Sequence, residues 1–428
     1  MKFFSIISFL AFVSVSIQLL GQDLQSYIER AKVNSPLIKE NQNQMEAANL
    51  EVEQLKALYT RAQISLSGSY LFAPVVSSDN GTSKLVLNPS GSEEDYFGYD
   101  ISASNGGTYQ GIVTIDQPLF NGARYEANKE LTLIGSQINE NNIQLTTHEL
   151  EKFVTDQYIL CLQQYKETDY LKSLITIIDD HEKVVSKLVE NGLANQSDLS
   201  LILIEKKSLL TELNKFNTSY RSSLMDLRII CGISDTAYQV LENIDLHLSE
   251  DVSNSQFVHK YDLDSMNLAA SQRVFELKYK PIVGVFANGG LNAVYAPTLP
   301  NRFGLSAGIN FTMNLTDGNQ RKITQQRTEV LMRSTSQYKN FFYHQNSARK
   351  NRIAQELKSL DARQTLIEDQ LSEYQRLLDL YKKELMYGQV SVFNYVSMLK
   401  NMVTTQRDFV LLQTNKALLI NLYNYWNW

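Results

Sequence analysis

Beyond its first 22 residues, the sequence lacks any apolar run long enough for a transmembrane helix, which needs about 20 such residues. It also lacks the clustered lysine and arginine that bind phosphate, and its net charge of −6 argues against a nucleic-acid partner. The five histidines are scattered without metal-ligand spacing, and no glycine-rich phosphate loop or serine nucleophile elbow is visible. The sequence therefore predicts neither an enzyme nor a helical membrane protein, and it implies no cofactor and no metal.

The single long apolar run lies at the N-terminus. A short positive start, Met1-Lys2, precedes an apolar stretch from Phe3 to Leu20 and a candidate cleavage point near residues 21 and 22. This pattern is typical of a secretory signal peptide over residues 1–22. An uncleaved membrane anchor is the alternative, because the stretch approaches spanning length.

Cysteine is nearly absent, with only Cys161 and Cys231 in the chain. Both fall in segments predicted as helices, on opposite arms of one helical hairpin. Export would place them in an oxidising compartment, where an even count permits a bridge. The narrow Cα spacing that a disulfide demands favours two buried free thiols instead.

Proline is missing from two long stretches, between Pro118 and Pro281 and after Pro300. Because proline breaks helices and glycine weakens them, these stretches are predicted to be helical. Glycine interrupts them at a few positions that serve as turns, notably Gly192 and Gly388. The expected elements are long helices over 121–192 and 317–388 and return helices over 197–232 and 391–426, with Ser197 and Ser391 as N-caps.

The two proline- and glycine-rich segments are predicted to form β-hairpins over 62–118 and 281–314. Apolar and polar residues alternate along Gln63–Phe72 and Phe303–Met313, as in strands with one apolar face. Their partner strands, residues 109–117 and 282–291, alternate less regularly, because the apolar residues Ile112 and Phe286 fall among the polar positions. The apolar set predicted to face lipid is Ile64, Leu66, Tyr70, Phe72, Val113, Ile115, Val283, Val285, Leu305, Ile309 and Phe311.

Each predicted strand has about ten residues, the length that a tilted strand needs to cross a bilayer. Aromatic residues near the strand ends suit an interfacial girdle: Tyr70, Phe72, Tyr96, Tyr99, Tyr109, Tyr295 and Phe303. The polar loop over residues 73–108 suits the cell exterior, or is a disordered insert. Two soluble hairpins packed on helices would give the same alternation, so alternation alone does not decide between them.

An internal duplication organises the chain. Heptad positions recur along both return helices, and the turn glycines are separated by 388 − 192 = 196 residues. Helices over Pro36–Arg61 and Phe257–Lys280 are expected to cover the part of each long helix that its return helix leaves bare. The predicted organisation is a first repeat over 23–232, an equatorial connector over 233–256 and a second repeat over 257–428.

Four strands in one chain cannot close a barrel, and open sheet edges are not tolerated in lipid. If the hairpins span a membrane, several copies of the chain must complete one barrel. Oligomerisation therefore follows from the membrane interpretation.

Several motifs in order resemble the TolC-type outer membrane factor family. They are the opening helix Tyr27–Leu37 with Asn34-Ser35-Pro36, the strand exits Gln117–Gly122 and Asn314–Gly318, and the helix turns Leu188–Gly192 and Leu385–Gly388. Each motif alone is weak, whereas their order, duplication and spacing are specific. The resemblance covers nearly the whole mature chain.

The resemblance implies an α+β membrane protein that forms a homotrimer, with a β-barrel of four strands per chain in outer-membrane lipid and a long α-helical barrel in the periplasm. It implies a periplasmic adaptor and an inner-membrane pump of the RND or ABC type as partners. Family members carry an acid six residues after the turn glycine that holds the periplasmic end closed. Asp198 has that position, whereas Asn394 and Ser397 in the second copy depart from the acidic pattern.

The predicted function is thus the outer-membrane exit duct of a tripartite efflux or type I secretion system, without enzymatic activity. Asp198 also has a purely structural interpretation, since an acid in the first turn of a helix is stabilised by the helix dipole. The alternative for the whole chain is a periplasmic coiled-coil scaffold or adaptor without a membrane span. That alternative gives no reason for two ten-residue hairpins at equivalent ends of both repeats.

Overall fold

A computed structural model describes residues 23–72, 75–79, 82–86, 96–97, 107–250, 252, 255–293, 296–387 and 389–428. The predicted signal peptide and Gly388 lie outside these residues. The chain divides into two compact units. The helical unit comprises Met1–Asn41, Asn142–Val258 and Asn340–Trp428, and the sheet unit comprises Gln42–Asn141 and His259–Lys339.

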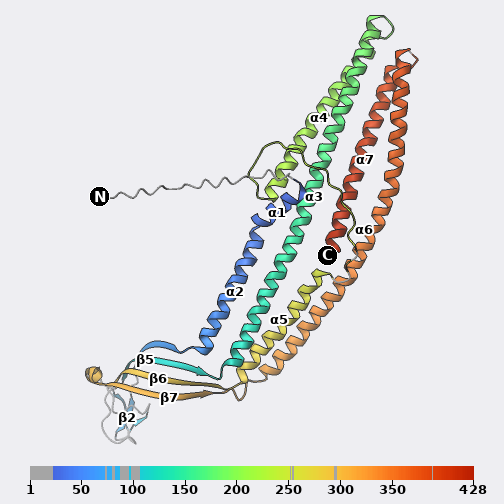
Figure 1. The fold of residues 1–428 in the computed structure, drawn as a ribbon. Helices are drawn as coiled ribbons and strands as arrows, with labels where there is room; N and C mark the ends of the chain where they lie inside the picture. Colours follow the sequence, from blue (N-terminus) through green and yellow to red (C-terminus); the bar gives the residue numbers. More distant parts are fainter. Residues whose placement is uncertain are drawn as a thin grey trace, which may run out of the picture. The chain divides into compact units, whose positions relative to one another are not determined.

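Long helices alternate with antiparallel strands along the chain (Figure 1). The helices are α1 (Leu24–Asn34), α2 (Pro36–Thr60), α3 (Gly122–Glu190), α4 (Gln196–Ile230), α5 (His259–Glu276), α6 (Gln320–Met386) and α7 (Val392–Trp426). The strands are β1 (Gln63–Phe72), β2 (Val75–Asp79), β3 (Thr82–Val86), β4 (Tyr96–Phe97), β5 (Gly107–Leu119), β6 (Ile282–Ala293) and β7 (Phe303–Thr312). Short 3-10 helices are η2 (Gln256–Val258), η3 (Leu277–Tyr279) and η4 (Ala296–Asn301). Within the described residues, no helix is both long and apolar enough to cross a membrane.

The sheet unit is built on four antiparallel strands in the order β1-β5-β6-β7. The two predicted hairpins are therefore joined into one sheet by pairing between β5 and β6, from Tyr109 opposite Ala293 to Leu119 opposite Val283. A second sheet of three short strands, β3-β2-β4, occupies the predicted polar loop. That loop therefore contains regular backbone structure, which its polar composition did not indicate.

The helix ends lie close to their predicted positions, with one wrong cap. The N-cap of α4 is Asn195, two residues before the predicted Ser197. Asn195 has extended backbone angles, and its N–H donates to the carboxylate of Asp198 at 3.0 Å. An acid at the third helical position thus fixes the helix start, which favours Asn195 over the serine. In α7 the predicted cap is confirmed, because Ser391 accepts the Asn394 N–H.

The return helices α4 and α7 have 35 residues each, and their first residues are separated by 392 − 196 = 196 positions. By contrast, α5 is shorter than the predicted Phe257–Lys280, because both of its ends tighten into the 3-10 helices η2 and η3. Such tightening is common at helix termini. Residues 233–250 form neither helix nor strand.

Three apolar clusters lie among the described residues of the helical unit, and two of them are large. The turn cluster joins α3, α4, α6 and α7 through side chains such as Ile178, Ile202 and Leu399. The α1 cluster joins α1, α3 and α4 around Tyr158, Tyr220 and Leu227. These faces carry most of the helix stability, because long helices depend on tertiary packing more than on intrinsic propensity.

Both cysteines lie in the α1 cluster as free, buried thiols. Burial raises the pKa of Cys161 and of Cys231 to about 12. Of the two options that the sequence left open, the structure therefore has free thiols.

Candidate functional site

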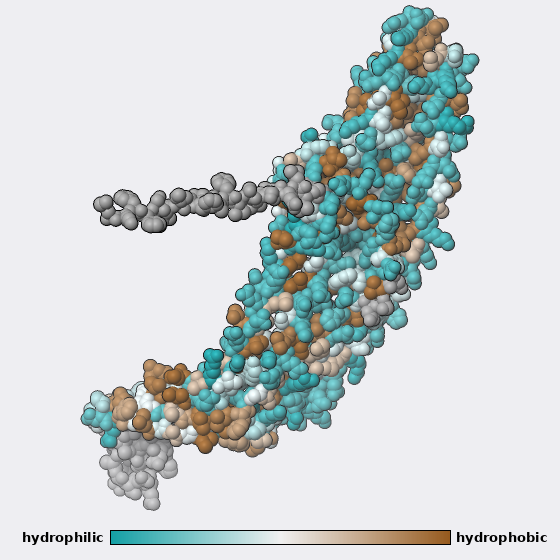
Figure 2. All heavy atoms as spheres, in the orientation of Figure 1, coloured by the Kyte–Doolittle hydropathy of each residue, from teal (hydrophilic) through white to brown (hydrophobic). Residues whose placement is uncertain are grey.

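One face of the four-stranded sheet is apolar. Residues directly opposite each other in antiparallel strands share a face. Leu66 lies opposite Val113, Val113 opposite Gly289, and Gly289 opposite Leu305. The same registers place all eleven residues predicted to face lipid on this apolar face. Figure 2 shows hydrophobic residues gathered over the sheet.

The apolar face is open to its surroundings along the outer strands. Leu66 and Leu305 are each 80% exposed, and Ile309 and Phe311 are also exposed. Contiguous exposed apolar surface of this kind marks contact with a membrane or another protein. Val283 and Val285 lie on the same face but are half-buried.

The opposite face is polar. It presents serines from β1, Gln110 and Thr114 from β5, and asparagines from β6 and β7. Ile112 and Phe286 interrupt it, as the alternation predicted, and Leu71 and Ile282 add two apolar residues near the strand ends. Phe286 lies opposite Gly308, where an added Cβ would come within 2.7 Å of the phenyl ring. The glycine thus makes room for the one aromatic residue of β6 on this polar face.

The predicted aromatic girdle is described in part. Tyr70 and Tyr109 lie opposite each other, with ring centroids 4.9 Å apart. Phe72 and Phe303 lie on the same face and toward the same end of the sheet. Tyr99 and Tyr295 fall outside the described residues, and for Tyr96 only the backbone is described.

The edge strands β1 and β7 each have one strand partner within the described chain. Their outer N–H and C=O groups are templates for pairing with another strand. Such groups cannot remain unpaired in a hydrocarbon environment. A single chain therefore satisfies the backbone of β5 and β6 but leaves both edges to a further partner if the sheet lies in lipid.

Side-chain hydrogen bonds tie the strand exits to the helices of the sheet unit. The Arg124 guanidinium donates to the backbone oxygens of Leu277 and Lys280, both at 2.8 Å. The Tyr279 hydroxyl donates to the carboxylate of Asp317, which also accepts the Arg321 N–H at 2.7 Å. The bonds from Tyr279 and Arg321 lower the pKa of Asp317. Together with the Arg124 bonds, they fix the two places where a strand passes into a long helix.

At the first helix turn, Gly192 ends α3 in the left-handed region with φ of +70°. The N–H of Leu193 donates to the oxygen of Leu188 at 2.7 Å, which closes the helix end in the manner of a Schellman motif. Asp198 is half-buried and uses one carboxylate oxygen to cap α4. Its structural role is thus visible, whereas its closing role stays a prediction.

The second helix turn is described except for Gly388. Asn394 and Ser397 are both exposed on the first turns of α7, and no acid stands at either position. Exposed apolar side chains surround both turns: Leu193 in the first and Tyr387 and Phe393 in the second. The sequence pattern did not single out these three residues, because isolated apolar residues at a turn show no periodicity.

Buried charges connect the return helices beside the turn cluster. Glu205 of α4 is 4% exposed and lies 2.9 Å from the ammonium of Lys400. Arg407 of α7 contacts the carboxylate of Glu212 at 2.7 Å and lies 3.9 Å from that of Glu167. Burial raises the pKa of Glu167 even though Arg407 opposes the shift. Such charges were not predicted, because their partners are distant in sequence.

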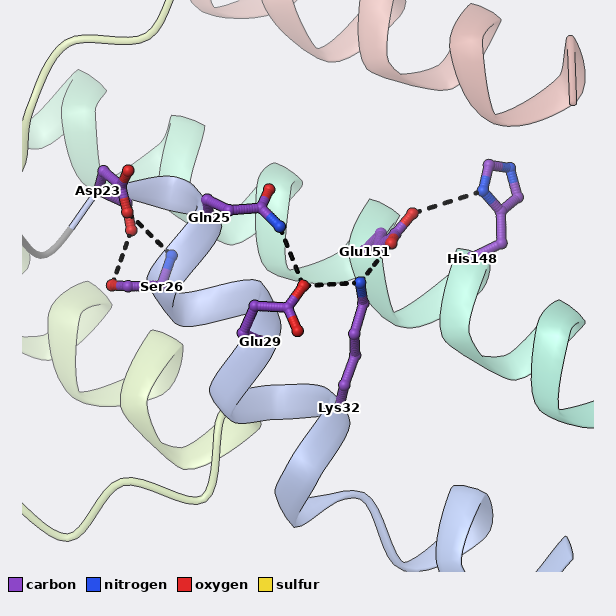
Figure 3. Close-up of polar contacts among 7 residues, drawn as sticks. All are labelled: Asp23, Gln25, Ser26, Glu29, Lys32, His148 and Glu151. Atoms are coloured by element: carbon purple, nitrogen blue, oxygen red, sulfur yellow. Dashed lines mark hydrogen bonds and ion pairs between the residues drawn. The ribbon is translucent and has the colours of Figure 1, made fainter. Parts of the chain in front are cut away.

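A polar network anchors α1 to α3 in the helical unit (Figure 3). Lys32 bridges Glu29 and Glu151, with its ammonium 2.9 Å from each carboxylate. Glu151 in turn lies 3.7 Å from Nδ1 of His148. The His148 ring stacks on Tyr425 and Trp428, at centroid distances of 5.0 and 4.2 Å. The network thus connects α1, α3 and the end of α7. Within the described residues, no cluster of histidine, cysteine and acidic residues is placed to hold a metal.

No protein-family model and no curated protein matches this sequence. Solved structures do match over almost the whole chain. The outer membrane protein VceC from Vibrio cholerae superposes with a TM-score of 0.68 at 15% identity, covering 94% of this chain and 96% of that one. The chain has the fold of outer membrane channels.

Two further channel structures show the same fold. The Campylobacter jejuni CmeC outer membrane channel has a TM-score of 0.67 at 11% identity, covering 95% of this chain and 86% of that one. The Neisseria gonorrhoeae MtrE outer membrane channel, in its open state, has a TM-score of 0.65 at 11% identity, covering 94% and 88%. The outer membrane channel fold confirms the resemblance that the sequence motifs indicated.

Proposed function

We propose that this protein is the outer-membrane exit duct of a tripartite efflux or type I secretion system. The observation that supports this most is the four-stranded sheet with one apolar exposed face, one polar face and two open edges. Lipid would cover the apolar face, and the polar face would line an aqueous passage. The fold shared with outer membrane channels agrees with this assignment.

Three copies of the chain form the closed barrel in this proposal, which gives 3 × 4 = 12 strands. Closure pairs β1 of one copy with β7 of the next, so that each open edge becomes an internal strand pair. The 10 residues of β1 extend about 33 Å at ~3.3 Å per residue. At a tilt of about 40° this length spans roughly the 25 Å apolar band of an outer-membrane barrel.

The helices extend the duct into the periplasm in the same proposal. The exposed apolar residues at the two helix turns, Leu193, Tyr387 and Phe393, would then meet a periplasmic adaptor, which couples the duct to an inner-membrane pump. Asp198 would help to hold this end closed in addition to capping α4. Substrates would pass passively, because the energy comes from the pump.

Cell fractionation tests the membrane assignment directly. Membranes are prepared and washed with alkaline carbonate, with a soluble periplasmic protein and an integral outer-membrane protein as markers. We expect the chain to stay with the integral marker. Recovery with the soluble marker would favour the periplasmic scaffold or adaptor and overturn the duct assignment.

A further inference from the structure

Two apolar side chains are almost fully exposed where the strands β5 and β7 pass toward the helices α3 and α6 (Figure 1). Phe120 is 87% exposed and Leu315 is 86% exposed, the highest values among the large apolar side chains of the described residues. Phe120 also has a φ of +56°, in the left-handed region that residues other than glycine rarely adopt. Backbone strain of this kind persists mainly at functional positions, so the exposed ring points to a contact outside the chain itself.

These side chains extend the apolar face of the sheet toward the helices. Leu119 lies on that face and directly precedes Phe120. At the other exit, Met313 and Leu315 continue the apolar alternation of Phe311 beyond the last residue of β7. We refer to Phe120, Met313 and Leu315, which are all exposed, as the apolar rim. Apolar surface therefore continues past the ends of the strands.

A basic segment lies between the two exits. It consists of η3 and the residue that follows it, and it carries two exposed lysines, Lys278 and Lys280. The carbonyl of Lys278 accepts the Asn314 amide at 3.0 Å, one residue before the rim leucine. The carbonyl of Lys280 accepts the Arg124 guanidinium at 2.8 Å, and the same guanidinium donates to Asn121, one residue after the rim phenylalanine. Hydrogen bonds thus hold the backbone of both lysines between the two parts of the apolar rim.

Positive charge prevails at this junction. The junction, taken as residues 119–124, 276–281 and 313–322, contains the cations Arg124, Lys278, Lys280, Arg321 and Lys322. It contains only two acids, Glu276 and Asp317, so it carries 5 − 2 = 3 net positive charges per chain. Both acids already have partners, since Glu276 lies 2.6 Å from the Arg321 guanidinium and Asp317 accepts a tyrosine hydroxyl. Within the described chain, no carboxylate pairs with the ammonium groups of the two η3 lysines, and that of Lys278 lies 4.8 Å from a phenyl ring.

The boundary layer of a phospholipid membrane offers both kinds of contact side by side. Its acyl chains cover apolar side chains, and its headgroup phosphates lie next to them. An anionic headgroup adds on the order of fivefold in affinity for each nearby lysine. Free phosphate would match the lysines alone and would leave the apolar rim in water.

We infer that the junction binds anionic phospholipid, with Lys278 and Lys280 at the headgroups and the apolar rim in the adjoining acyl chains. The inference rests on the proposed duct function, which places the sheet in a membrane. It adds a lipid preference to the leaflet nearest the helices.

Lipid preference at the junction tests the headgroup contact. Thr316 is exposed beside Leu315, and Thr316→Cys can be labelled with bimane in the full chain, because Cys161 and Cys231 are buried. The labelled chain is inserted into vesicles of phosphatidylcholine and phosphatidylglycerol in equal amounts, with bromine on the acyl chains of one lipid or the other. We expect brominated phosphatidylglycerol to quench the label more strongly, and we expect the difference to shrink as salt is added.

Charge variants locate the headgroup. Lys278→Gln together with Lys280→Gln should lower the relative affinity for phosphatidylglycerol by about 25-fold, from about fivefold for each lysine. The matched control replaces Lys172 and Lys187, two exposed lysines of α3 that lie at least 172 − 122 = 50 residues along the helix from its start. Equal quenching by both brominated lipids, or an equal loss in the control, overturns the inference and leaves the duct intact. Failure to insert into any vesicle would overturn the duct and the inference together.

Two glycine substitutions test the apolar rim. Asn319 has a φ of +69° and is exposed, so it matches Phe120 in backbone strain without carrying an apolar side chain. Both Phe120→Gly and Asn319→Gly relieve that strain, but only the first removes a ring. In phosphatidylglycerol vesicles we expect Asn319→Gly to keep or raise the unfolding temperature and Phe120→Gly to lower it. A rise in Phe120→Gly would show that the exposed ring gains nothing from lipid, and it would overturn the role of the apolar rim.

Discussion

Replacing Leu66 with arginine tests which side of the sheet faces lipid. Leu66 is the fourth and Ser67 the fifth of the 10 residues of β1, so both lie near the middle of the strand. Leu66 points to the apolar face and Ser67 to the polar face. The two positions thus share a depth and differ only in the face, which makes Ser67→Arg the matched control.

The expected loss of stability follows from the depth of the residue in the bilayer. An arginine on the lipid face near the bilayer centre destabilises an outer-membrane barrel by about 2–4 kcal/mol. Three copies of Leu66→Arg in one barrel would therefore lose roughly 6–12 kcal/mol, a substantial fraction of ordinary protein stability. In Ser67→Arg the guanidinium would lie in the aqueous passage, and we expect a change within about 0.5 kcal/mol.

The measurement is the free energy of unfolding from lipid vesicles in denaturant, together with the yield of each variant in the outer-membrane fraction. A soluble protein would give a different pattern, because Leu66 is 80% exposed and arginine at a wet surface position costs little. Equal stability of Leu66→Arg and the unsubstituted chain would refute the assignment of this face to lipid. So would an equal loss in Ser67→Arg.

Three further predictions concern the helical unit. Asp198→Ala removes the acceptor of the Asn195 N–H, and we expect it to raise the resting conductance of channels in planar bilayers. Unchanged conductance together with a loss of about 1 kcal/mol in stability would mean that Asp198 only caps the helix. Cys161 and Cys231, whose pKa values burial raises to about 12, should resist maleimide at pH 8 until the chain is denatured, and rapid labelling of the folded chain would contradict their burial. Burial, reinforced by the nearby Lys382 charge, lowers the pKa of His181 from 6.5 to about 4, so the unfolded chain gains a proton first as pH falls. Stability should drop between those values by at most about 3 kcal/mol, from 6.5 − 4 = 2.5 units at ~1.36 kcal/mol each, and His181→Leu should flatten that slope; an unchanged slope in the variant would be evidence against it.

The regular elements were predictable because their signals are local. Alternation along Gln63–Phe72 predicts β1 with its observed limits. The absence of proline after Pro300 predicts the helices α6 and α7. The eleven apolar residues share one face because strand period and register both follow from the same alternation.

Three features were not predicted, each for a different reason. The N-cap of α4 is Asn195 rather than Ser197 because the Asn195 N–H donates to the carboxylate of Asp198, a local bond that two candidate capping residues so close together leave ambiguous in the sequence. The strands within residues 73–108 were not predicted, because the composition of this segment is that of a polar loop. The ion pairs of Arg407 were not predicted, because their partners, Glu167 of α3 and Glu212 of α4, are distant in sequence.

The mass of the protein after gentle extraction from membranes tests the central claim most directly. The whole sequence has a mass of 48.8 kDa, and native mass spectrometry counts how many copies remain together. A barrel completed by neighbouring copies predicts a detergent-stable species of three chains. A clean monomer, folded and extracted from the membrane in quantity, would contradict the shared barrel.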